Sequence, residues 1–376
     1  MDMPLMRRKF LGVASAATAG VLAGNPQSVY AQTSGQKNLT PGKLLRIGVL
    51  TCHPTHHHMP NIYGPIIQCV ANGNYVPTRM TGMILTHIWD HDPKRVESYC
   101  EKFGTKPVKR YKDMVGEVDG IMLTDLRAAD YYHVLAEPYL KAGIPVFFNR
   151  CFTPRVKRAK AVVELSKKYG TPILVPSEWE YTEPLYTLRD KVKQFGPKIR
   201  GVTGYNWSVE ITHDVHGLWL LLAAVGGGVE SVAVNRSVKS IFDQGTDTWT
   251  IKFKQRKDND SFYATLHNTY NFGTNASLRI NFDTMSFEEN IWGSGNMGTV
   301  FQFLMVPPLL AFQRIIEGQG MEQSHEHIVE KTAAFIAGFK SHLELGGQPA
   351  LLSELDDDYC VYSDPNPTTY PDGTFD

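Results

Sequence analysis

The sequence predicts two successive domains, a doubly wound α/β domain with a parallel sheet and an α+β domain with an open, mainly antiparallel sheet. In the first half, short apolar runs alternate with helical patterns, as parallel strands alternate with crossover helices. In the second half, one helical pattern precedes a series of β-rich runs, which favours an antiparallel sheet. The chain has 376 residues, 42% of them hydrophobic, which suffices for two cores.

Five strand-like runs and four helical patterns make up the first domain. The strands are expected at residues 45–50, 82–89, 120–124, 145–148 and 172–175. The helices are expected at residues 93–103, 111–115, 131–142 and 154–169. A parallel sheet of this kind binds ligands at the carboxyl ends of its strands, so the residues that follow each strand are the first candidates for a site.

The second domain begins with a strand-like run and then a helical pattern. Its strands are expected at residues 202–207, 229–238, 246–254, 262–270 and 276–282, and its helices at residues 213–225 and 325–344. Prolines and acidic residues near the C-terminus predict an irregular tail. These patterns place the first domain at residues 45–176, the second at residues 177–350 and the tail at residues 351–376.

The N-terminus carries the pattern of an export signal. Arg7 and Arg8 precede a small-residue apolar stretch at residues 13–23 and a short cleavage-like site. This order predicts a twin-arginine signal peptide at residues 1–31, a linker at residues 32–44 and a periplasmic location. A basic segment before a buried helix is the alternative. The apolar stretch is too short for a membrane span, and twin-arginine export carries folded cargo that can already hold a cofactor.

The charge balance and the cysteines exclude two further classes. The chain has 38 basic and 38 acidic residues, and loss of residues 1–31 removes three basic residues and one acid, which leaves 35 against 37. A nearly neutral surface offers no electrostatic footprint for nucleic acid. The five cysteines are scattered and form no CxxC pair. We therefore expect free thiols rather than a disulfide framework.

Several segments carry a resemblance to a known family. They are residues 84–97, residues 111–121, His133 with residues 136–146, and His216 followed ten residues later by Gly226. Over residues 45–357 the chain resembles the glucose-fructose oxidoreductase / inositol dehydrogenase / MocA family. The resemblance implies a Rossmann-like domain followed by a substrate domain, and action on sugars, cyclitols or their derivatives. It also implies a homo-oligomer that pairs through the outer face of the open sheet.

The chain departs from this family at two places that bear on nucleotide chemistry. Family members carry Glu-Lys-Pro or Asp-Lys-Pro, whose lysine helps to relay the alcohol proton, where this chain has Asn149-Arg150-Cys151. Arginine stays protonated, but its planar fork suits a carboxylate. Residues 51–60 contain four histidines and two prolines in place of the glycines that admit a pyrophosphate. Both departures argue against NAD(P), for which Asp90 remains the candidate ribose ligand.

His213 and His216 are the first catalytic candidates. The resemblance implies that His216 is the active-site histidine, and His213 lies one turn earlier on the same helix face. A helix N-terminus disfavours imidazolium, so both rings are expected to be neutral and able to act as a base or a ligand. A divalent metal held by His213, His216 and His56 is one alternative. A pair of structural polar residues is the other.

Five more residues are expected to face the same cleft. Tyr132 and His133 follow the strand that ends near residue 124. Tyr132 is a candidate for contact with the substrate, and His133 is a catalytic candidate. Glu178, Trp179 and Tyr181 follow the strand that ends near residue 175, where sugar enzymes often present a stacking aromatic ring beside hydroxyl-binding carboxylates. The alternative for His133 is a solvent-exposed position at the start of a helix. The alternative for Glu178, Trp179 and Tyr181 is a loop that only packs against the second domain.

An arginine beside neutral histidines favours a reaction on an acidic sugar. We expect a carbohydrate dehydratase or lyase that performs β-elimination at a non-reducing-end uronic acid of an oligosaccharide, in extracytoplasmic polysaccharide degradation. Arg150 would hold the carboxylate, and His216, His213 and His133 would supply the base and the acid. An NAD(P)-dependent sugar oxidoreductase exported with its cofactor is one alternative. A sugar-binding protein without catalysis is the other.

Overall fold

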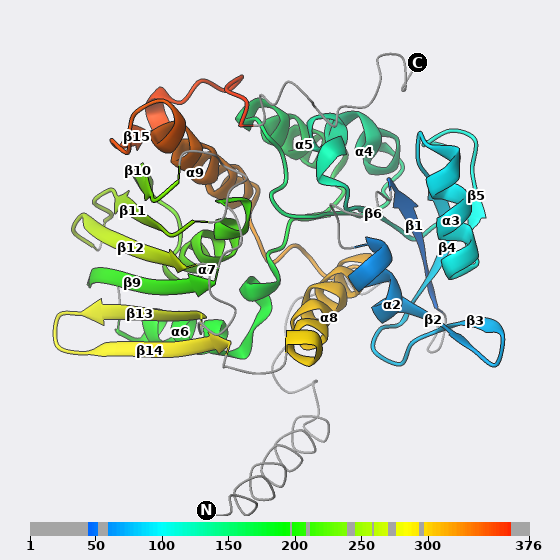
Figure 1. The fold of residues 1–376 in the computed structure, drawn as a ribbon, viewed down its shortest axis with the longest axis horizontal. Helices are drawn as coiled ribbons and strands as arrows, with labels where there is room; N and C mark the ends of the chain where they lie inside the picture. The colour runs from blue at the N-terminus through cyan, green and yellow to red at the C-terminus, as the bar shows by residue number, and fades with distance from the viewer. Residues whose placement is uncertain are drawn as a thin grey trace, which may run out of the picture. The chain divides into compact units, whose positions relative to one another are not determined.

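The computed structural model describes residues 44–51, 59–195, 198–207, 211–238, 245–257, 259–269, 276–292 and 297–361 (Figure 1). The predicted signal peptide, almost all of the predicted linker, residues 52–58 with all four loop histidines, and residues 362–376 lie outside the described residues. All described residues belong to one unit, Asn38–Asp376.

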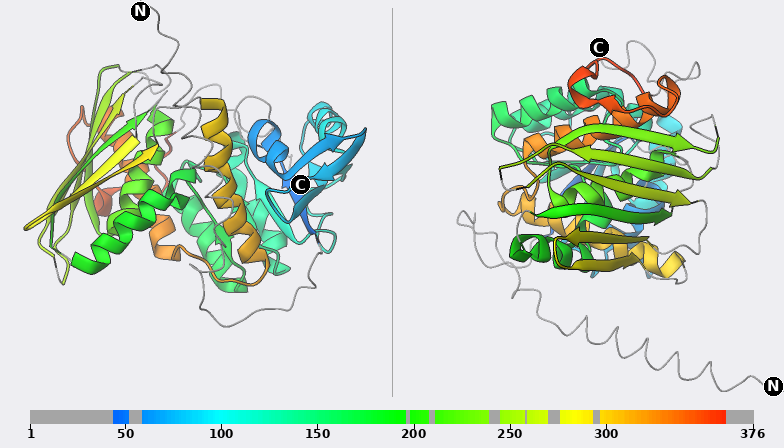
Figure 2. Two further views of the ribbon diagram at one scale, coloured as in Figure 1. Left: turned by 90° about the horizontal axis from the view of Figure 1, so that it is seen from below. Right: turned by 90° about the vertical axis from the view of Figure 1, so that its left-hand side faces the viewer.

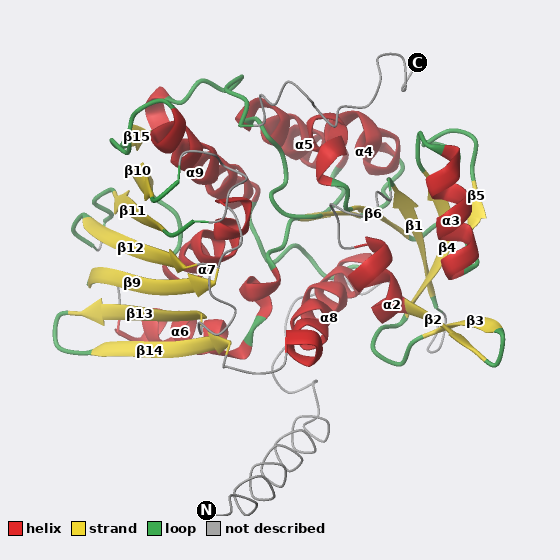
Figure 3. Cartoon of the chain, in the orientation of Figure 1, coloured by secondary structure: helices red, strands yellow, loops and turns green. Residues whose placement is uncertain are grey.

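The first sheet contains six strands in the order β5-β4-β1-β6-β7-β8, of which Figure 3 labels β5, β4, β1 and β6. They are β1 (Leu45–Leu50), β4 (Met83–Trp89), β5 (Lys106–Pro107), β6 (Gly120–Leu123), β7 (Val146–Phe148) and β8 (Ile173–Leu174). Every pairing is parallel. The chain order reverses between β1 and β6, and this switch point is where open α/β sheets bind ligands. A separate hairpin joins β2 (Gln68–Ala71) and β3 (Asn74–Pro77).

Crossover helices connect the strands of the first sheet. They are α3 (Pro93–Phe103), α4 (Tyr132–Lys141) and α5 (Val156–Tyr169). The start of α3 follows from sequence, because Asp92 accepts a hydrogen bond from the amide of Lys94 and a proline occupies the first helical position. Its end follows too, because Gly104 adopts φ 64°, a conformation that glycine adopts without strain. Residues 111–115, predicted to be helical, form turns instead.

A helix from the late part of the chain completes the first domain. Helix α8 (Met297–Ile316) packs its apolar face against the first sheet beside the short segments η2 (Met59–Tyr63) and α2 (Gly64–Ile67). The Phe312 ring lies edge-on to Phe147, with centroids 5.6 Å apart. A Cβ atom at position 120 would lie 2.6 Å from the side chain of Ile316, so Gly120 permits this close approach.

The second sheet contains seven strands in the order β14-β13-β9-β12-β11-β10-β15. They are β9 (Ile199–Trp207), β10 (Val229–Arg236), β11 (Asp247–Phe253), β12 (Phe262–Thr269), β13 (Ala276–Phe282), β14 (Ser286–Trp292) and β15 (Ala350–Leu351). The β12–β9 pairing is parallel and the others are antiparallel. Alternate side chains of β11 and β12 are buried, as expected for a sheet with one covered face.

Helices cover one face of the second sheet, as Figure 2 shows. They are α6 (Glu183–Phe195), α7 (Val215–Val225) and α9 (His325–Leu343). The link between the domains contains the short 3-10 turn η4 (Glu178–Tyr181), and η5 (Ile211–Asp214) leads into α7. The predicted two-domain architecture is confirmed. Among the described residues, no helix combines the length and apolar character that crossing a bilayer requires.

Candidate functional site

The strands at the switch point end in register. Leu50 of β1 pairs with Leu123 of β6, which pairs with Phe148 of β7. The residues that follow these three form a row at the carboxyl edge of the sheet: Thr51, Thr124 and Asn149. Sequence analysis singled out only the last of them, because the row depends on strand register and not on any one motif.

This row contains polar groups that are buried and unsatisfied. All three side chains are at most 1% exposed. The Oγ1 atoms of Thr51 and Thr124 and the Oδ1 atom of Asn149 form no hydrogen bond with any described residue. The Asn149 amide nitrogen donates to the carbonyl of Thr124 at 3.2 Å, which fixes the orientation of the group. Buried polar atoms are almost always paired, so this row is suited to a ligand with hydrogen-bonding groups.

Arg150 follows the row and is 4% exposed. Burial lowers the pKa of His213 well below its ordinary value, and the positive charge of Arg150 lowers it further. Burial raises the pKa of Glu178, and Arg150 opposes that rise. Burial and the charge of Glu178 raise the pKa of Tyr63, which Arg150 again opposes. The charge of Arg150 therefore acts on His213, Glu178 and Tyr63, and the sequence alone did not point to Tyr63.

His216, near the start of α7, is 3% exposed and held on several sides. Its Nδ1 atom lies 2.8 Å from the hydroxyl of Ser177 and 3.5 Å from the carboxyl of Glu178. Its ring stacks on Trp179 with centroids 5.3 Å apart, and the ring of His213 lies 6.2 Å away. A carboxyl group beside Nδ1 favours a proton on that nitrogen, which gives Nε2 the lone pair that a base needs.

The turn η4 presents these contacts because its sequence forms a capping box. The amide of Trp179 donates to the Ser177 hydroxyl, and the amide of Ser177 donates to the Glu180 carboxyl at 2.6 Å. The short segment therefore fixes the hydroxyl of Ser177 and the ring of Trp179 against His216. The structure brings together five of the predicted site residues: Arg150, His213, His216, Glu178 and Trp179.

Tyr132 and His133 have other partners. Tyr132 is fully buried, and its hydroxyl donates to the carbonyl of Asp125 at 3.0 Å. The Nε2 atom of His133 lies 3.1 Å from the guanidinium of Arg158 on α5, and burial lowers the pKa of His133. Among the described residues, the contacts of His133 join α4 to α5. The predicted roles of both residues stay predictions.

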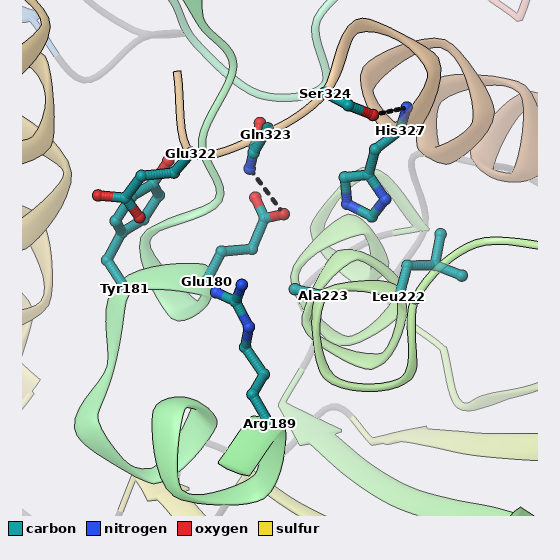
Figure 4. Close-up of a pocket in the computed structure, with 10 residues that line it drawn as sticks. Glu180, Tyr181, Arg189, Leu222, Ala223, Glu322, Gln323, Ser324 and His327 are labelled. Carbon is teal, nitrogen blue, oxygen red and sulfur yellow. Dashed lines mark hydrogen bonds between the residues drawn. The ribbon is translucent and has the colours of Figure 1, made fainter. Parts of the chain in front are cut away.

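Tyr181 lines a separate pocket of about 240 Å³, shown in Figure 4. The tyrosine is 4% exposed, and its hydroxyl forms no hydrogen bond with any described residue. The pocket is also lined by Glu180, Arg189 and His327. The last turns of α7, and not the first turn with His216, form one wall of this pocket. The predicted role of Tyr181 in substrate binding stays a prediction.

Asp90 lies where the predicted ribose ligand belongs, directly after β4. Its carboxyl accepts a hydrogen bond from the amide of Asp92 at 2.9 Å and lies 3.1 Å from His91 and 3.5 Å from Arg95. A groove of about 1030 Å³ runs beside it along α3. Asp90 is thus a buried acceptor with the guanidinium of Arg95 nearby.

A metal site depends on residues outside the described part of the chain. Within that part, no three histidine, cysteine, aspartate or glutamate side chains are grouped closely enough to hold a metal ion. His56, the third predicted ligand, lies outside it. The divalent-metal alternative therefore stays a prediction.

No family model matches the chain, and no curated protein matches its sequence. Solved structures match its fold. The scyllo-inositol dehydrogenase of Lactobacillus casei with NAD(H) and scyllo-inositol has a TM-score of 0.64 at 13% identity, over 83% of this chain and 100% of that chain. The myo-inositol dehydrogenase of the same organism, with NAD(H) and myo-inositol, has a TM-score of 0.65 at 12% identity, over 82% and 96%. An Agrobacterium radiobacter oxidoreductase with NAD+, L-tartaric acid and magnesium has a TM-score of 0.62 at 13% identity, over 82% and 98%.

These comparisons overturn the interpretation of the chain as a β-eliminating carbohydrate lyase, because the three solved structures named above are described as two dehydrogenases and an oxidoreductase. The interpretation took the loss of the proton-relaying lysine at Arg150 as the loss of redox chemistry. The structure places a second ionisable side chain in this region, because His216 is buried with its Nδ1 atom 2.8 Å from Ser177 and 3.5 Å from Glu178. The chain has the two-domain fold of the glucose-fructose oxidoreductase / inositol dehydrogenase / MocA-type dehydrogenases.

Proposed function

We propose that the protein is an NAD(P)-dependent oxidoreductase that converts a secondary hydroxyl of a sugar-like substrate to a ketone and back. The observation that carries this proposal is the row of Thr51, Thr124 and Asn149, whose two buried hydroxyls and one buried amide oxygen have no hydrogen-bond partner among the described residues. The row lies at the switch point of a Rossmann-type sheet, where dinucleotides bind. It borders the cluster that contains His216.

The residues present fit a nicotinamide coenzyme. The hydroxyls of Thr51 and Thr124 can donate and accept hydrogen bonds, and the free carbonyl oxygen of Asn149 can accept from an amide. Asp90, after the second strand of the sheet, can accept from a ribose hydroxyl. When bound, the coenzyme supplies a hydride acceptor or donor.

His216 is the proposed proton acceptor. Oxidation of an alcohol releases one proton from the hydroxyl, and a neutral imidazole can take it up. Ser177 and Glu178 hold Nδ1, which favours the tautomer whose Nε2 carries a lone pair. His213 lies beside this ring with its pKa lowered by burial, so it remains neutral and does not repel a protonated His216.

The presence of Arg150 favours a substrate that carries a carboxylate. Its guanidinium cannot relay a proton, but it can form two parallel hydrogen bonds with a carboxylate. It is 4% exposed, so a charge-assisted hydrogen bond there is only weakly screened. The related oxidoreductase from Agrobacterium radiobacter was solved with L-tartaric acid, a hydroxy acid. We therefore propose an acidic sugar or polyol as the substrate class. We also propose export to the periplasm with the coenzyme already bound.

Calorimetric titration with NAD+ and NADP+, on protein first freed of any co-purified nucleotide, tests the coenzyme assignment without a known substrate. Replacement of Thr124 by Val keeps the shape and removes the hydroxyl, so affinity should fall about five- to tenfold, equivalent to one hydrogen bond of about 1 kcal/mol. Thr250→Val, in the second sheet, is the matched control and should bind like the wild type. Failure of both nucleotides to bind the wild type would contradict the proposal.

A further inference from the structure

A buried ion pair lies behind the candidate base. Lys331 on α9 is 0% exposed, and its ammonium lies 3.0 and 3.1 Å from the two carboxyl oxygens of Glu180. It also donates to the carbonyl of Val175 at 2.7 Å and to the side chain of Gln323 at 3.2 Å. The ring of Trp219 lies 3.9 Å from it. The ammonium is thus held from the end of the first sheet, from η4 and from the segment before α9.

Glu180 connects this ammonium to the active-site cluster. One carboxyl oxygen accepts from the amide of Ser177 at 2.6 Å, and the other accepts from the side chain of Gln323 at 3.0 Å, as Figure 4 shows for Gln323. The hydroxyl of Ser177 lies 2.8 Å from Nδ1 of His216. An unbroken series of short contacts therefore runs from Lys331 through Glu180 and Ser177 to His216.

Replacing a buried ion pair by apolar residues of similar volume is often neutral or stabilising, because it avoids the cost of desolvating two charges, so stability alone is a weak explanation for this pair. Burial lowers the pKa of Lys331 to about 8 and raises that of Glu180, so both groups carry the cost of charge burial. Charge-assisted hydrogen bonds constrain the geometry of the groups that they join. A carboxylate that accepts from the backbone of Ser177 and from the ammonium of Lys331 ties the start of η4 to α9.

We propose that Lys331 and Glu180 are positioning residues that orient the imidazole of His216 through Ser177. The inference rests on the proposed function only in taking His216 as the base. The orientation of the ring is a property of the protein alone, and it can be measured without substrate.

The test compares Lys331→Met with Arg236→Met. Arg236 forms another fully buried pair, 2.7 Å from Asp247 in the second sheet, so its loss also leaves a carboxylate without its cation. The NMR titration of the His216 imidazole is followed in both variants. We expect the Lys331→Met midpoint to move by about 0.5 unit or more and the Nδ1 signal to lose its hydrogen-bonded shift. Arg236→Met should leave both unchanged.

A second variant guards against loss of folding. Lys331→Met combined with Glu180→Met removes both charges, so no unpaired ion remains buried, and it also removes the oxygen that accepts from the Ser177 amide. It should fold, and it should show the same altered His216 signal because the carboxylate that holds Ser177 is gone. Where turnover is measurable, kcat should fall about tenfold with KM changed less than about twofold, since the coenzyme and substrate contacts remain.

The outcomes separate this inference from the function. A normal His216 signal in the single and double variants would overturn the positioning role, whatever the protein catalyses. A displaced His216 signal in a protein that binds no nicotinamide coenzyme would support the positioning role and contradict the proposed function.

Discussion

The acid stability of the protein depends in part on His327, on the first turns of α9. Burial lowers the pKa of His327 to about 3, and the nearby charges of Lys331 and Arg189 act in the same direction. In the unfolded chain the ring titrates near its ordinary value of 6.5. The unfolded state therefore binds more protons between pH 6.5 and 3. The stability that His327 contributes is present above pH 6.5 and is lost as the pH falls toward 3.

The magnitude follows from the two pKa values. Each unit of difference is worth about 1.4 kcal/mol, so between pH 7 and pH 4 the free energy of unfolding should fall by about 3 kcal/mol through this residue. Replacement of His327 by Gln keeps a neutral polar side chain and removes the titration. The variant should therefore lose about 3 kcal/mol less than the wild type over this range.

Urea unfolding, followed by tryptophan fluorescence at pH 7, 5.5 and 4, measures this difference. His342→Gln, in the last turn of the same helix, is the matched control and should lose stability in acid as the wild type does. Equal losses for the wild type and His327→Gln between pH 7 and pH 4 would show that the ring of His327 does not stay neutral in the folded protein.

Three further variants test the site. Ser177→Ala removes the partner of His216 and the cap of η4, so the free energy of unfolding should fall by about 1–2 kcal/mol and kcat about tenfold; unchanged kcat would count against the orienting contact. Arg150→Met should raise KM for carboxylated substrates about 10- to 100-fold and KM for neutral substrates far less. An equal rise in KM for both kinds of substrate would refute the carboxylate contact. Asp90→Asn should weaken NAD+ binding about tenfold by titration calorimetry; wild-type affinity would remove Asp90 from the coenzyme site.

Local signals account for the elements that sequence analysis located well. β1 and α3 were predicted at the residues observed, because a continuous apolar run and a complete set of caps mark them. Helix α8 was not predicted, since Pro307 and Pro308 lie inside it. It is stabilised by packing against a sheet whose last strand ends more than 120 residues earlier, and no local pattern reports that contact.

The residues of the site likewise include some that the sequence points to and some that depend on distant packing. Arg150 and Glu178 could be expected near one edge of the first sheet because they follow its strands, and His216 was singled out by the family resemblance. The capping-box spacing from Ser177 to Glu180 was a readable signal for the rigid turn beside His216. The contacts of Lys331 and Tyr63 with this region could not be predicted, because they depend on how distant segments pack.

The central claim is that the site transfers hydride to or from a nicotinamide coenzyme. The most direct measurement is the absorbance of the reduced coenzyme when the purified protein is mixed with NAD+ or NADP+ and a panel of hydroxylated sugar acids and their neutral counterparts. We expect reduced coenzyme to form with at least one sugar acid, and His216→Ala to slow its formation about 100-fold or more. The claim would be contradicted by one combined result. The protein would bind the coenzyme tightly, yet no acid or neutral member of the panel would reduce NAD+ or NADP+, and none of the corresponding ketones would oxidise NADH or NADPH.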